Sequence, residues 1–483
     1  ALLNLLKGLT SHEAATIYFP VGHYVLKENM TFPENVHLLF DYGAMLKPEG
    51  DITIDIPVTI DAHMTQVFSG AGKVIGHFGG QAVYPQWWGA KGDKKSDDTA
   101  AFQHVFRLSK ETDRAITIYV PQGDYVWTDA LEVHGHTSVL CETGAIFWRN
   151  HTRTMLYNYE YNGTPSPGYS GNGHIVFENA RFEFVAYDPS FLCYEDGNVL
   201  QFAHASDWVF RNCEFYDVID AHAIEINSSK NVLIEGCKFY GYRELAQNRW
   251  YVEAIQIDHA GTEGIQGALP YDNTHCKHIM IKDCYFGKGR TYTLMKDGKE
   301  VTIEFESWPA AIGGHTHKED HWHENIMIIN NTFDRMRYFA VRPYKWLNTL
   351  VTGNVFYECG GGIYAVSGSE HQNFGAAQPF KRLSILDNQF IDGQQIYPEH
   401  FQGNRRFAIG IYSTAVVSED VKIEGNIIQV TKDSGMIINN VSRVSIANNV
   451  IHDMERNGIE INGCSNLLIN QNHIQRISEY GMT

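Results

Sequence analysis

A short segment recurs through the second half of the chain, and this repeat constrains the fold more than any other feature. Each copy holds two apolar stretches, such as HAIEIN at 222–227 and VLIEGCKF at 232–239. The sixth residue of the second stretch is always Cys or Asn. In order, these residues are Cys213, Cys237, Cys284, Asn331, Asn354, Asn388, Asn426, Asn449 and Asn472. Where no insertion intervenes, the spacing is 23 or 24 residues.

A repeat of this length with two or three short strands is typical of one coil of a parallel β-helix. The asparagines of the repeat predict an internal ladder of stacked amides. The cysteines at the same position should be small buried thiols rather than metal ligands or disulfide partners. Leucine-rich repeats are similar in length, but their L-x-x-L-x-L frame is missing. We therefore predict an all-β fold, a single-stranded parallel β-helix of about nine or more rungs.

The N-terminal third holds a different repeat. TIYFPVGHYV at 16–25 matches TIYVPQGDYV at 117–126, an offset too long for one coil, so we predict two related β-rich units. Between them, the polar residues at 96–98 can begin a helix whose apolar face includes Phe102, Val105 and Phe106. Such a capping helix would cover the open edge of the first rung of the β-helix.

These patterns divide the chain into three expected parts. They are an N-terminal β-rich domain (1–83), a segment with a linker motif, the capping helix and the first coils (84–196), and the main β-helix (197–483). Insertions are expected at 240–251, 259–276, 287–308, 315–324, 367–380 and 391–407. Because loops carry function while bare rungs only stack, we expect the binding groove between Glu225 and Tyr412.

Both ends of the sequence carry expectations. The start lacks an initiator Met and a basic segment, so we interpret it as a trimmed chain rather than a signal peptide. At the other end, Gly481 and Met482 match the beginning of a repeat such as Gly435 and Met436. Because a coil that ends partway exposes unpaired backbone groups, we expect the natural chain to continue with a capping or trimer-forming segment.

Three motifs near the capping helix point to a known group of proteins. They are YPQWWGAKGD at 84–93, DDTAAF at 97–102 and VPQGDY at 120–125. With the coil repeat, the chain resembles right-handed parallel β-helix proteins of the pectate-lyase superfamily, specifically bacteriophage tailspike depolymerases. The resemblance covers most of the chain at the level of the fold. It implies a right-handed coil, a homotrimer, a carbohydrate substrate and a location on the virion tail or otherwise outside the cell.

Charge narrows the choice of partner. Lys and Arg number 38 against 56 Asp and Glu, a formal net charge of −18. A chain this acidic is a poor candidate for binding nucleic acid or an anionic membrane through bulk electrostatics. No apolar run approaches the 18 or so residues of a membrane span, so we expect no membrane insertion. The expected partner is a bacterial surface polysaccharide, and a local basic cleft could still bind an anionic one.

Alternation within the first stretch of each repeat predicts the candidate site. Ile224 and Ile226 should point into the core and Glu225 should point outward, with neighbouring rungs about 4.8 Å apart. Stacking the rungs predicts an exposed patch with Glu225, Asp258 and His315 as candidate catalytic residues. The candidate substrate-binding residues are Gln256, His259, Arg342, Tyr344, Lys345, Tyr364, Trp308 and Trp322.

Glu225 and Asp258 form the most informative carboxylate pair. One rung and one outward position separate them, a diagonal of about 8 Å, which suits the water of an inverting glycosidase. We therefore favour hydrolysis, with one carboxyl as general acid and the other as base. Replacing either should lower turnover by orders of magnitude with little change in thermal stability, because both should point outward. Other carboxylates stand nearby if the register differs, namely Asp217, Asp220 and Glu253.

Three other functions stay open. In a lyase for a uronate polymer, Arg342 or Lys345 would neutralise the uronate while His259, His315 or Tyr344 abstracts the proton. The four histidines from His315 to His323 could bind a metal in a teichoic-acid-type phosphodiesterase. Their spacing matches no helical zinc motif, however, so we expect no metal. We also expect no cofactor. A non-enzymatic receptor-binding spike would only grip the glycan.

Overall fold

The computed structural model describes residues 14–183, 197–245, 249, 251–261, 265–296, 298–316, 318–368, 376–393 and 407–483. These residues form two compact units. Unit 1 extends to His151 and includes Met155–Tyr159 and Asn172–Phe182. Unit 2 holds Thr152–Thr154, Glu160–Gly171 and Glu183–Thr483. Within the described part of the chain, no helix is long and apolar enough to cross a membrane.

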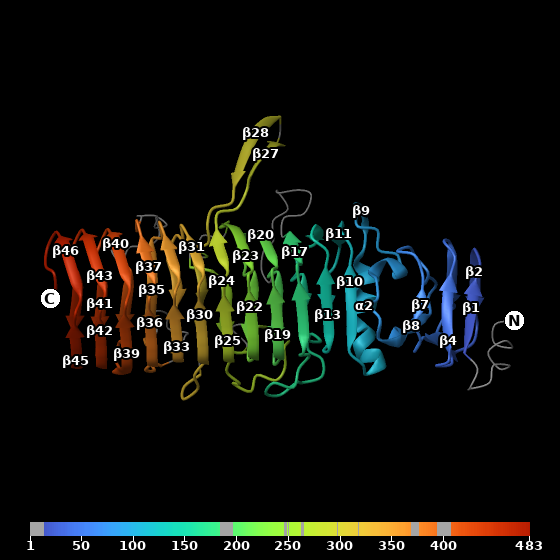
Figure 1. The fold of residues 1–483 in the computed structure, drawn as a ribbon, viewed down its shortest axis with the longest axis horizontal. Coiled ribbons are helices and arrows are strands. Elements are labelled where there is room, and N and C mark those ends of the chain that lie inside the picture. The colour runs from blue at the N-terminus through green and yellow to red at the C-terminus, as the bar shows by residue number, and fades with distance from the viewer. Residues whose placement is uncertain are drawn as a thin grey trace. The chain divides into compact units, whose positions relative to one another are not determined.

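Unit 1 is built from short parallel strands (Figure 1). Its first sheets contain β1 (Ala15–Phe19), β4 (Val36–Phe40) and β7 (Ile60–Asp61), then β2 (Gly22–Leu26) and β5 (Ala44–Pro48), then β3 (Met30–Thr31), β6 (Thr53–Asp55) and β8 (Lys73–Ile75). Two 3₁₀ turns follow, η1 (Phe78–Gly80) and η2 (Pro85–Trp88). The later strands are β9 (Asp93–Asp97), β11 (Gly123–Trp127), β14 (Ala145–Arg149) and β17 (Arg181–Glu183), then β10 (Ile116–Val120), β13 (Thr137–Cys141) and β16 (Ile175–Glu178), then β12 (Leu131–Glu132) and β15 (Leu156–Tyr157). The expected N-terminal β domain is confirmed.

The predicted capping helix is α2 (Thr99–Thr112), which packs on β10 and β12. Its predicted apolar face is confirmed, because Phe102, Val105 and Phe106 are fully buried. Asp98 occupies the N-cap position, but its carboxylate does not cap the helix. It instead accepts the backbone N–H groups of Lys91 (2.6 Å) and Gly92 (3.3 Å), and so ties the preceding loop to the helix start.

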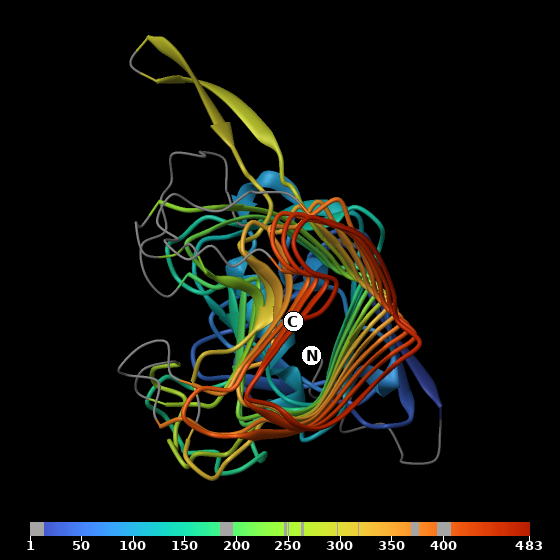
Figure 2. The ribbon, with the colours of Figure 1, turned by 90° about the vertical axis from the view of Figure 1, so that its left-hand side faces the viewer.

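Unit 2 is a parallel β-helix with three sheets, and Figure 2 shows it viewed down the axis around which the coils wind. The β19 sheet holds β19 (Ser206–Arg211), β22 (Lys230–Glu235), β25 (Lys277–Lys282), β30 (Glu324–Ile329), β33 (Leu347–Thr352), β36 (Lys381–Leu386), β39 (Ser418–Glu424), β42 (Val441–Ala447) and β45 (Ser465–Asn470). The β20 sheet holds β20 (Glu214–Ile219), β23 (Lys238–Arg243), β26 (Tyr285–Gly287), β31 (Thr332–Asp334), β34 (Val355–Tyr357), β37 (Gln389–Ile391), β40 (Ile427–Thr431), β43 (Val450–Met454) and β46 (His473–Ile477). The β18 sheet holds β18 (Leu200–Ala203), β21 (Ile224–Asn227), β24 (Glu253–Asp258), β29 (Ala310–Gly313), β32 (Phe339–Arg342), β35 (Gly361–Val366), β38 (Ile409–Tyr412), β41 (Met436–Asn439) and β44 (Ile459–Asn462). The predicted fold class is confirmed.

The predicted internal ladder runs along one corner of unit 2. The Asn331 side chain donates from Nδ2 to Oδ1 of Asn354 (3.0 Å), and Asn354 donates in the same way to Asn388 (2.9 Å). The series continues through Asn426 and Asn449 to Asn472. Each amide also binds backbone groups of adjacent rungs, as when Asn388 donates to the carbonyl of Val351 (3.0 Å). The ladder therefore satisfies buried backbone groups at a corner where the strands end.

The cysteines at the head of this ladder also meet expectation. Cys213, Cys237 and Cys284 are buried free thiols.

Between β26 and β29, one insertion forms a separate antiparallel hairpin of β27 (Thr291–Lys296) and β28 (Lys299–Glu304), which projects from the coils (Figure 2). Its root is fixed where Arg290 Nε binds Asp217 Oδ2 (2.6 Å).

Candidate functional site

The outward face of the β18 sheet carries the predicted site residues, but this face is covered. Glu225 on β21 pairs in register with Gln256 on β24, and Asn227 pairs with Asp258, so the two carboxylates stand one rung and two residues apart. Glu225 is 4% exposed, Gln256 3% and Asp258 0%. The expectation of an exposed patch was therefore wrong, because alternation fixes which way a side chain points but not what packs over it.

Glu225 lies among amide side chains. Its Oε2 accepts hydrogen bonds from Nδ2 of Asn198 (2.5 Å) and Nε2 of Gln201 (2.6 Å). Burial, together with the nearby Asp258 carboxylate, raises the pKa of the Glu225 carboxyl to about 7, although its hydrogen bonds to amide side chains oppose the shift. Near neutral pH, Glu225 can therefore hold a proton or release it, as a general acid requires.

Asp258 has the opposite environment. Its Oδ1 accepts the backbone N–H groups of His315 (3.1 Å) and Thr316 (3.0 Å), and its Oδ2 accepts a short hydrogen bond from Gln256. Burial acts to raise the pKa of Asp258, but the charge of His315 and these hydrogen bonds outweigh it and hold the pKa below its ordinary value. With its oxygens so occupied, Asp258 orients the start of the 314–323 loop.

His315 connects Asp258 to solvent. Its Nδ1 lies 3.7 Å from Oδ2 of Asp258, and its side chain is 19% exposed. The ring also lies edge-on to Tyr251, with ring centroids 6.5 Å apart. Tyr251 and the predicted residue His259 are partly exposed. His315 is therefore the best placed of the three candidate catalytic residues to reach a bound molecule.

Glu253 and Arg342 add a buried ion pair to this cluster. Arg342 Nη1 lies 3.3 Å from Oε1 of Glu253, whose side chain is fully buried. Burial raises the pKa of Glu253, although the charges of His315 and Arg342 oppose this shift. Sequence reasoning gave Glu253 only as a substitute and placed Arg342 against substrate, whereas the structure pairs the two.

Two contacts were missed by sequence reasoning. His222 donates from Nδ1–H to the Glu253 carbonyl (2.7 Å), and its backbone N–H donates to Oδ1 of Asn198 (2.9 Å). Burial lowers the pKa of His222 to about 3, so its imidazole is neutral at pH 7. The sequence carried a signal for these contacts. Two residues before the first inward apolar residue of three successive rungs stand Asn198, His222 and Glu253, which form one polar column.

The histidine-rich segment does not form one cluster among its described members. His323 is buried and its Nδ1 accepts the backbone N–H of Cys276 (3.0 Å), whereas His321 is exposed and contacts the carbonyl of Glu319. His317 lies outside the described residues. Among the residues that are described, no group of three His, Cys, Asp or Glu side chains has the geometry of a metal site.

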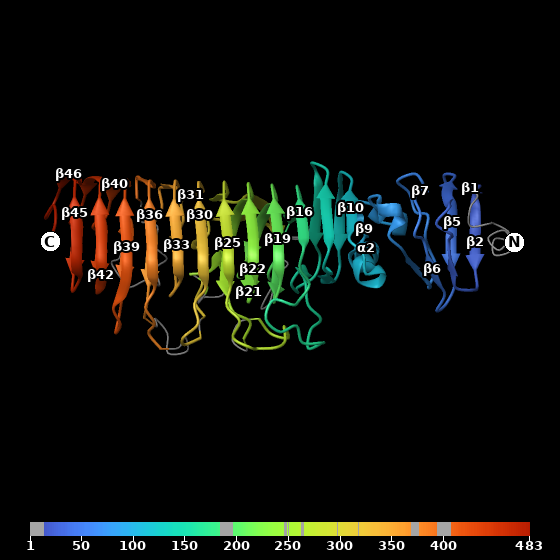
Figure 3. The same ribbon diagram turned by 60° about the horizontal axis from the view of Figure 1, so that its bottom comes forward.

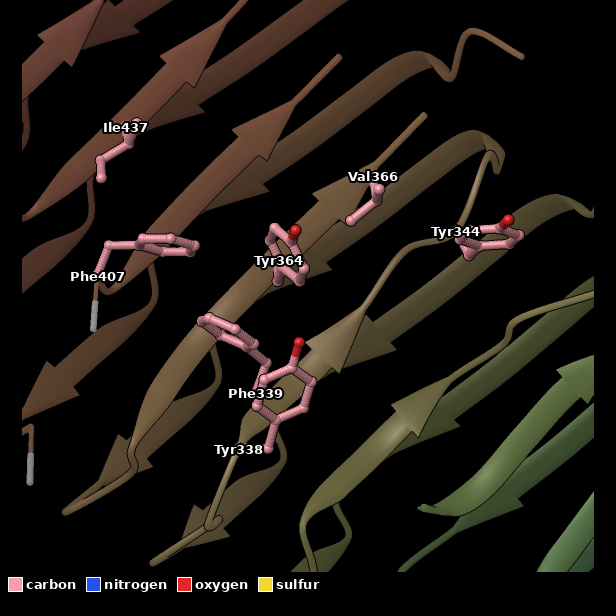
Figure 4. Close-up of a cluster of buried hydrophobic side chains, with 7 residues drawn as sticks. All are labelled: Tyr338, Phe339, Tyr344, Tyr364, Val366, Phe407 and Ile437. Atoms are coloured by element: carbon pink, nitrogen blue, oxygen red, sulfur yellow. The ribbon is translucent and has the colours of Figure 1, made fainter. Parts of the chain in front are cut away.

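Aromatic side chains occupy the same outward face on the next rungs. Tyr338, Phe339, Tyr344, Tyr364, Val366, Phe407 and Ile437 form a buried cluster (Figure 4). The rings of Tyr364 and Phe339 are tilted by 32° with centroids 4.7 Å apart, and Phe339 stacks on Phe407 with centroids 5.0 Å apart. The predicted substrate contacts of Tyr344 and Tyr364 are therefore not available at the surface, because both rings pack against neighbours.

The remaining predicted binding residues are also held by the protein. Lys345 is buried over the Tyr344 ring and donates from Nζ to the carbonyl of Ala376 (2.9 Å), and burial lowers its pKa to about 8. Trp308 is fully buried against Tyr242, so it has no face to offer a sugar in this conformation. Trp322 is half-buried, with its indole N–H bound to the Pro379 carbonyl (2.8 Å).

Comparison with known proteins supports the fold. A family model described as "Right handed beta helix region" matches residues 198–378 and 387–483. A second, "Rhamnogalacturonase A/epimerase, pectate lyase-like", matches residues 87–140, which include two of the motifs at the capping helix. Together these matches bear out the resemblance to pectate-lyase-like β-helices, while the tailspike resemblance is not tested by them.

Similar proteins come from Streptococcus pneumoniae. Its plasmin and fibronectin-binding protein A is 27% identical over 332 residues, which cover 64% of this chain and 44% of that protein. The chain thus spans less than half the length of this relative. The crystal structure of PfbA, a surface adhesin, has a TM-score of 0.69 at 19% identity and covers 83% of this chain and 93% of that one. A second structure of PfbA gives 0.66 at 20% identity, covering 83% and 99%.

Proposed function

The chain belongs to the right-handed β-helix family, and from this premise we propose that it is an extracellular depolymerase that binds and hydrolyses a bacterial surface polysaccharide. One observation carries the proposal. Two carboxyls on adjacent rungs, Glu225 and Asp258, have pKa values shifted in opposite directions, and His315 lies beside them. Titratable groups pushed apart in this way are the mark of an acid–base pair.

The geometry suggests a role for each group. Glu225, with a pKa of about 7, is the general acid that protonates the leaving oxygen. His315, in its neutral form, is the group that takes a proton from the attacking water, and Asp258 is the positioning residue that holds its ring and backbone. This assignment replaces the direct base role that the sequence suggested for Asp258, because the oxygens of Asp258 already accept several hydrogen bonds.

Hydrolysis fits the cluster better than elimination. A lyase acting on a uronate needs a cation to neutralise the substrate carboxylate, and the two cations that the sequence suggested for this role already have partners. Arg342 pairs with Glu253, and Lys345 binds the carbonyl of Ala376. A new absorbance band from an unsaturated product would support the lyase instead. Loss of cleavage in a chelator would support the metal-dependent phosphodiesterase.

The proposal is tested by polymer size. The wild-type protein should convert a surface polysaccharide into oligosaccharides, and Glu225→Gln should slow this by about two orders of magnitude or more, because a general acid contributes that much. Glu214→Gln is the matched control, since Glu214 lies on β20 in a surface ion pair with Lys238 (3.1 Å) and should leave the rate unchanged. Equal rates for all three proteins contradict the assignment.

A second candidate is a non-enzymatic surface adhesin. It is favoured by the similarity to the plasmin and fibronectin-binding protein and by the burial of Glu225 and Asp258. In this case the protein would hold its ligand, a glycan or a host protein such as plasmin or fibronectin, without shortening it. Saturable binding with an unchanged polymer length would select this function. Placement on a phage tail and assembly as a homotrimer also belong to the proposal and rest on the resemblance of the 84–125 motifs.

A further inference from the structure

Side chains from other parts of the coil hold the loop that carries His315. This loop joins β29 to β30 and spans residues 314–323. At its start, the backbone N–H groups of His315 and Thr316 donate to Oδ1 of Asp258. Nε2 of Gln256 lies 3.3 Å from both ring nitrogens of His315, so the ring packs against this amide. The position of the loop therefore decides whether His315 stands over Gln256 and Asp258.

The far part of the same loop is bound by one buried amide. Gln378 is 4% exposed, its Oε1 accepts the backbone N–H of Asp320 (2.8 Å), and its Nε2 donates to the carbonyl of His321 (2.8 Å). The loop presents one donor and one acceptor at this point, and a neutral amide side chain matches both. The next residue of the loop is also bound, because the Trp322 indole N–H donates to the Pro379 carbonyl (2.8 Å).

Gln378 reaches the loop from another coil. It lies just before β36, whereas the loop ends just before β30, and β33 lies between these two strands (Figure 3). At the usual spacing of strands, the two rungs span about 10 Å. The backbone N–H of Gln378 donates to the carbonyl of Ser367 (2.9 Å) just after β35, and Phe380 is buried. The amide that binds the loop is therefore presented by a segment that is itself fixed to the coil.

We propose that Gln378 is a positioning residue, which binds residues 320–321 and so keeps the loop closed with His315 over Gln256 and Asp258. The inference rests on the proposed function, in which His315 takes the proton from the attacking water. A catalytic group must be held close to its productive geometry, and a small displacement caused by a distant change can slow a reaction about 100-fold. The Gln378 amide binds the loop beyond His315, so it acts through the backbone of the loop.

Amide hydrogen exchange tests the position of the loop without any substrate. Gln378→Met keeps the length of the side chain and loses both hydrogen bonds, so the Asp320 amide should exchange about tenfold faster or more. If Gln378 positions His315, the amides of His315 and Thr316 should exchange faster as well. Asn449→Ala is the matched control, because it removes a buried ladder amide on other rungs and should leave these three exchange rates unchanged.

Catalysis gives a second readout. On a polysaccharide that the wild type cleaves, Gln378→Met should lower kcat about tenfold or more and change KM less than about twofold, because Gln378 binds the loop rather than the sugar. Asn449→Ala should leave both constants unchanged. If the methionine variant does not fold, Gln378→Glu takes its place, since its carboxylate cannot donate to the carbonyl of His321.

Two results overturn the inference. One is faster exchange at Asp320 alone, with His315 and Thr316 unchanged, and the other is an unchanged kcat in the folded variant. A wild type that cleaves no polymer contradicts the proposed function instead, and the exchange rates then still decide whether Gln378 holds His315 in place.

Discussion

At the scale of single residues, Glu225 illustrates how burial sets chemistry. Its side chain points away from the β-helix core, yet it is 4% exposed and bound by Asn198 and Gln201. The sequence located this residue correctly on the outward face of β21. It could not reveal the burial, because what covers the face depends on how the insertions fold. The same limit applies to Tyr344 and Lys345.

The raised pKa of Glu225 has a consequence for stability. Its carboxyl has a pKa of about 7 in the folded protein and an ordinary value of 4.5, so the folded state binds the proton more tightly between these values. Stability from this group is therefore present at low pH and lost as pH rises, by roughly 3 kcal/mol in total. Glu225→Gln removes this titration. Melting temperatures of both proteins between about pH 5 and pH 8 should shift in favour of the variant as pH rises.

A constant difference in melting temperature across this range would contradict the prediction. It would mean that the Glu225 carboxyl titrates at the same pH in the folded and unfolded protein.

Asp258 leads to a different expectation. Because it is fully buried and its Oδ1 accepts two backbone N–H groups, Asp258→Asn should lower stability by about 1–3 kcal/mol. This reverses the earlier expectation of unchanged thermal stability. Asp283→Asn serves as control, since Asp283 is exposed and has the left-handed backbone that Asn tolerates. Thermal melts that place both variants together would refute the anchoring role of Asp258.

At the scale of elements, the repeat predicted the corner that matters most for the coil. The Asn column could be found from sequence because Cys or Asn recurs once per rung at one position. The residue before it could have been found too. It is Asn, Asp, Gly or Gln in every rung, and its φ is positive throughout, for example 54° at Asn330, 66° at Gly353 and 54° at Asp387. Asn, Asp and Gly are the residues that adopt this backbone most readily.

The ladder predicts graded costs along the coil. Asn388→Ala should destabilise the protein by roughly 2–4 kcal/mol, because it removes partners from Asn354, Asn426 and the Val351 carbonyl in a buried site. Asn472→Ala should cost less, since Asn472 is half-buried on the last described rung. Chemical denaturation of the two variants measures the difference. Equal losses would show that the ladder contributes no more than its packing volume.

At the scale of the whole molecule, the sequence predicts the stack of coils well and the candidate site only in part. Coil spacing, inward alternation and the capping helix follow from local periodicity and are confirmed. The pairing of Arg342 with Glu253 spans two rungs, from β24 past β29 to β32. Such contacts leave no local pattern in the sequence. The sequence therefore indicated the region of the candidate site but not which of its side chains bind one another.

The central claim is that unit 2 hydrolyses a polysaccharide through Glu225, and mass spectrometry of reaction products tests it most directly. Surface polysaccharides from a panel of bacteria should be incubated with the wild-type protein, with Glu225→Gln and with Glu214→Gln. The account predicts fragments that have gained one water per cleavage with the wild type and with Glu214→Gln, and nearly intact polymer with Glu225→Gln. Fragments that lack this water, or polymer bound by the wild type but left uncut, would contradict it.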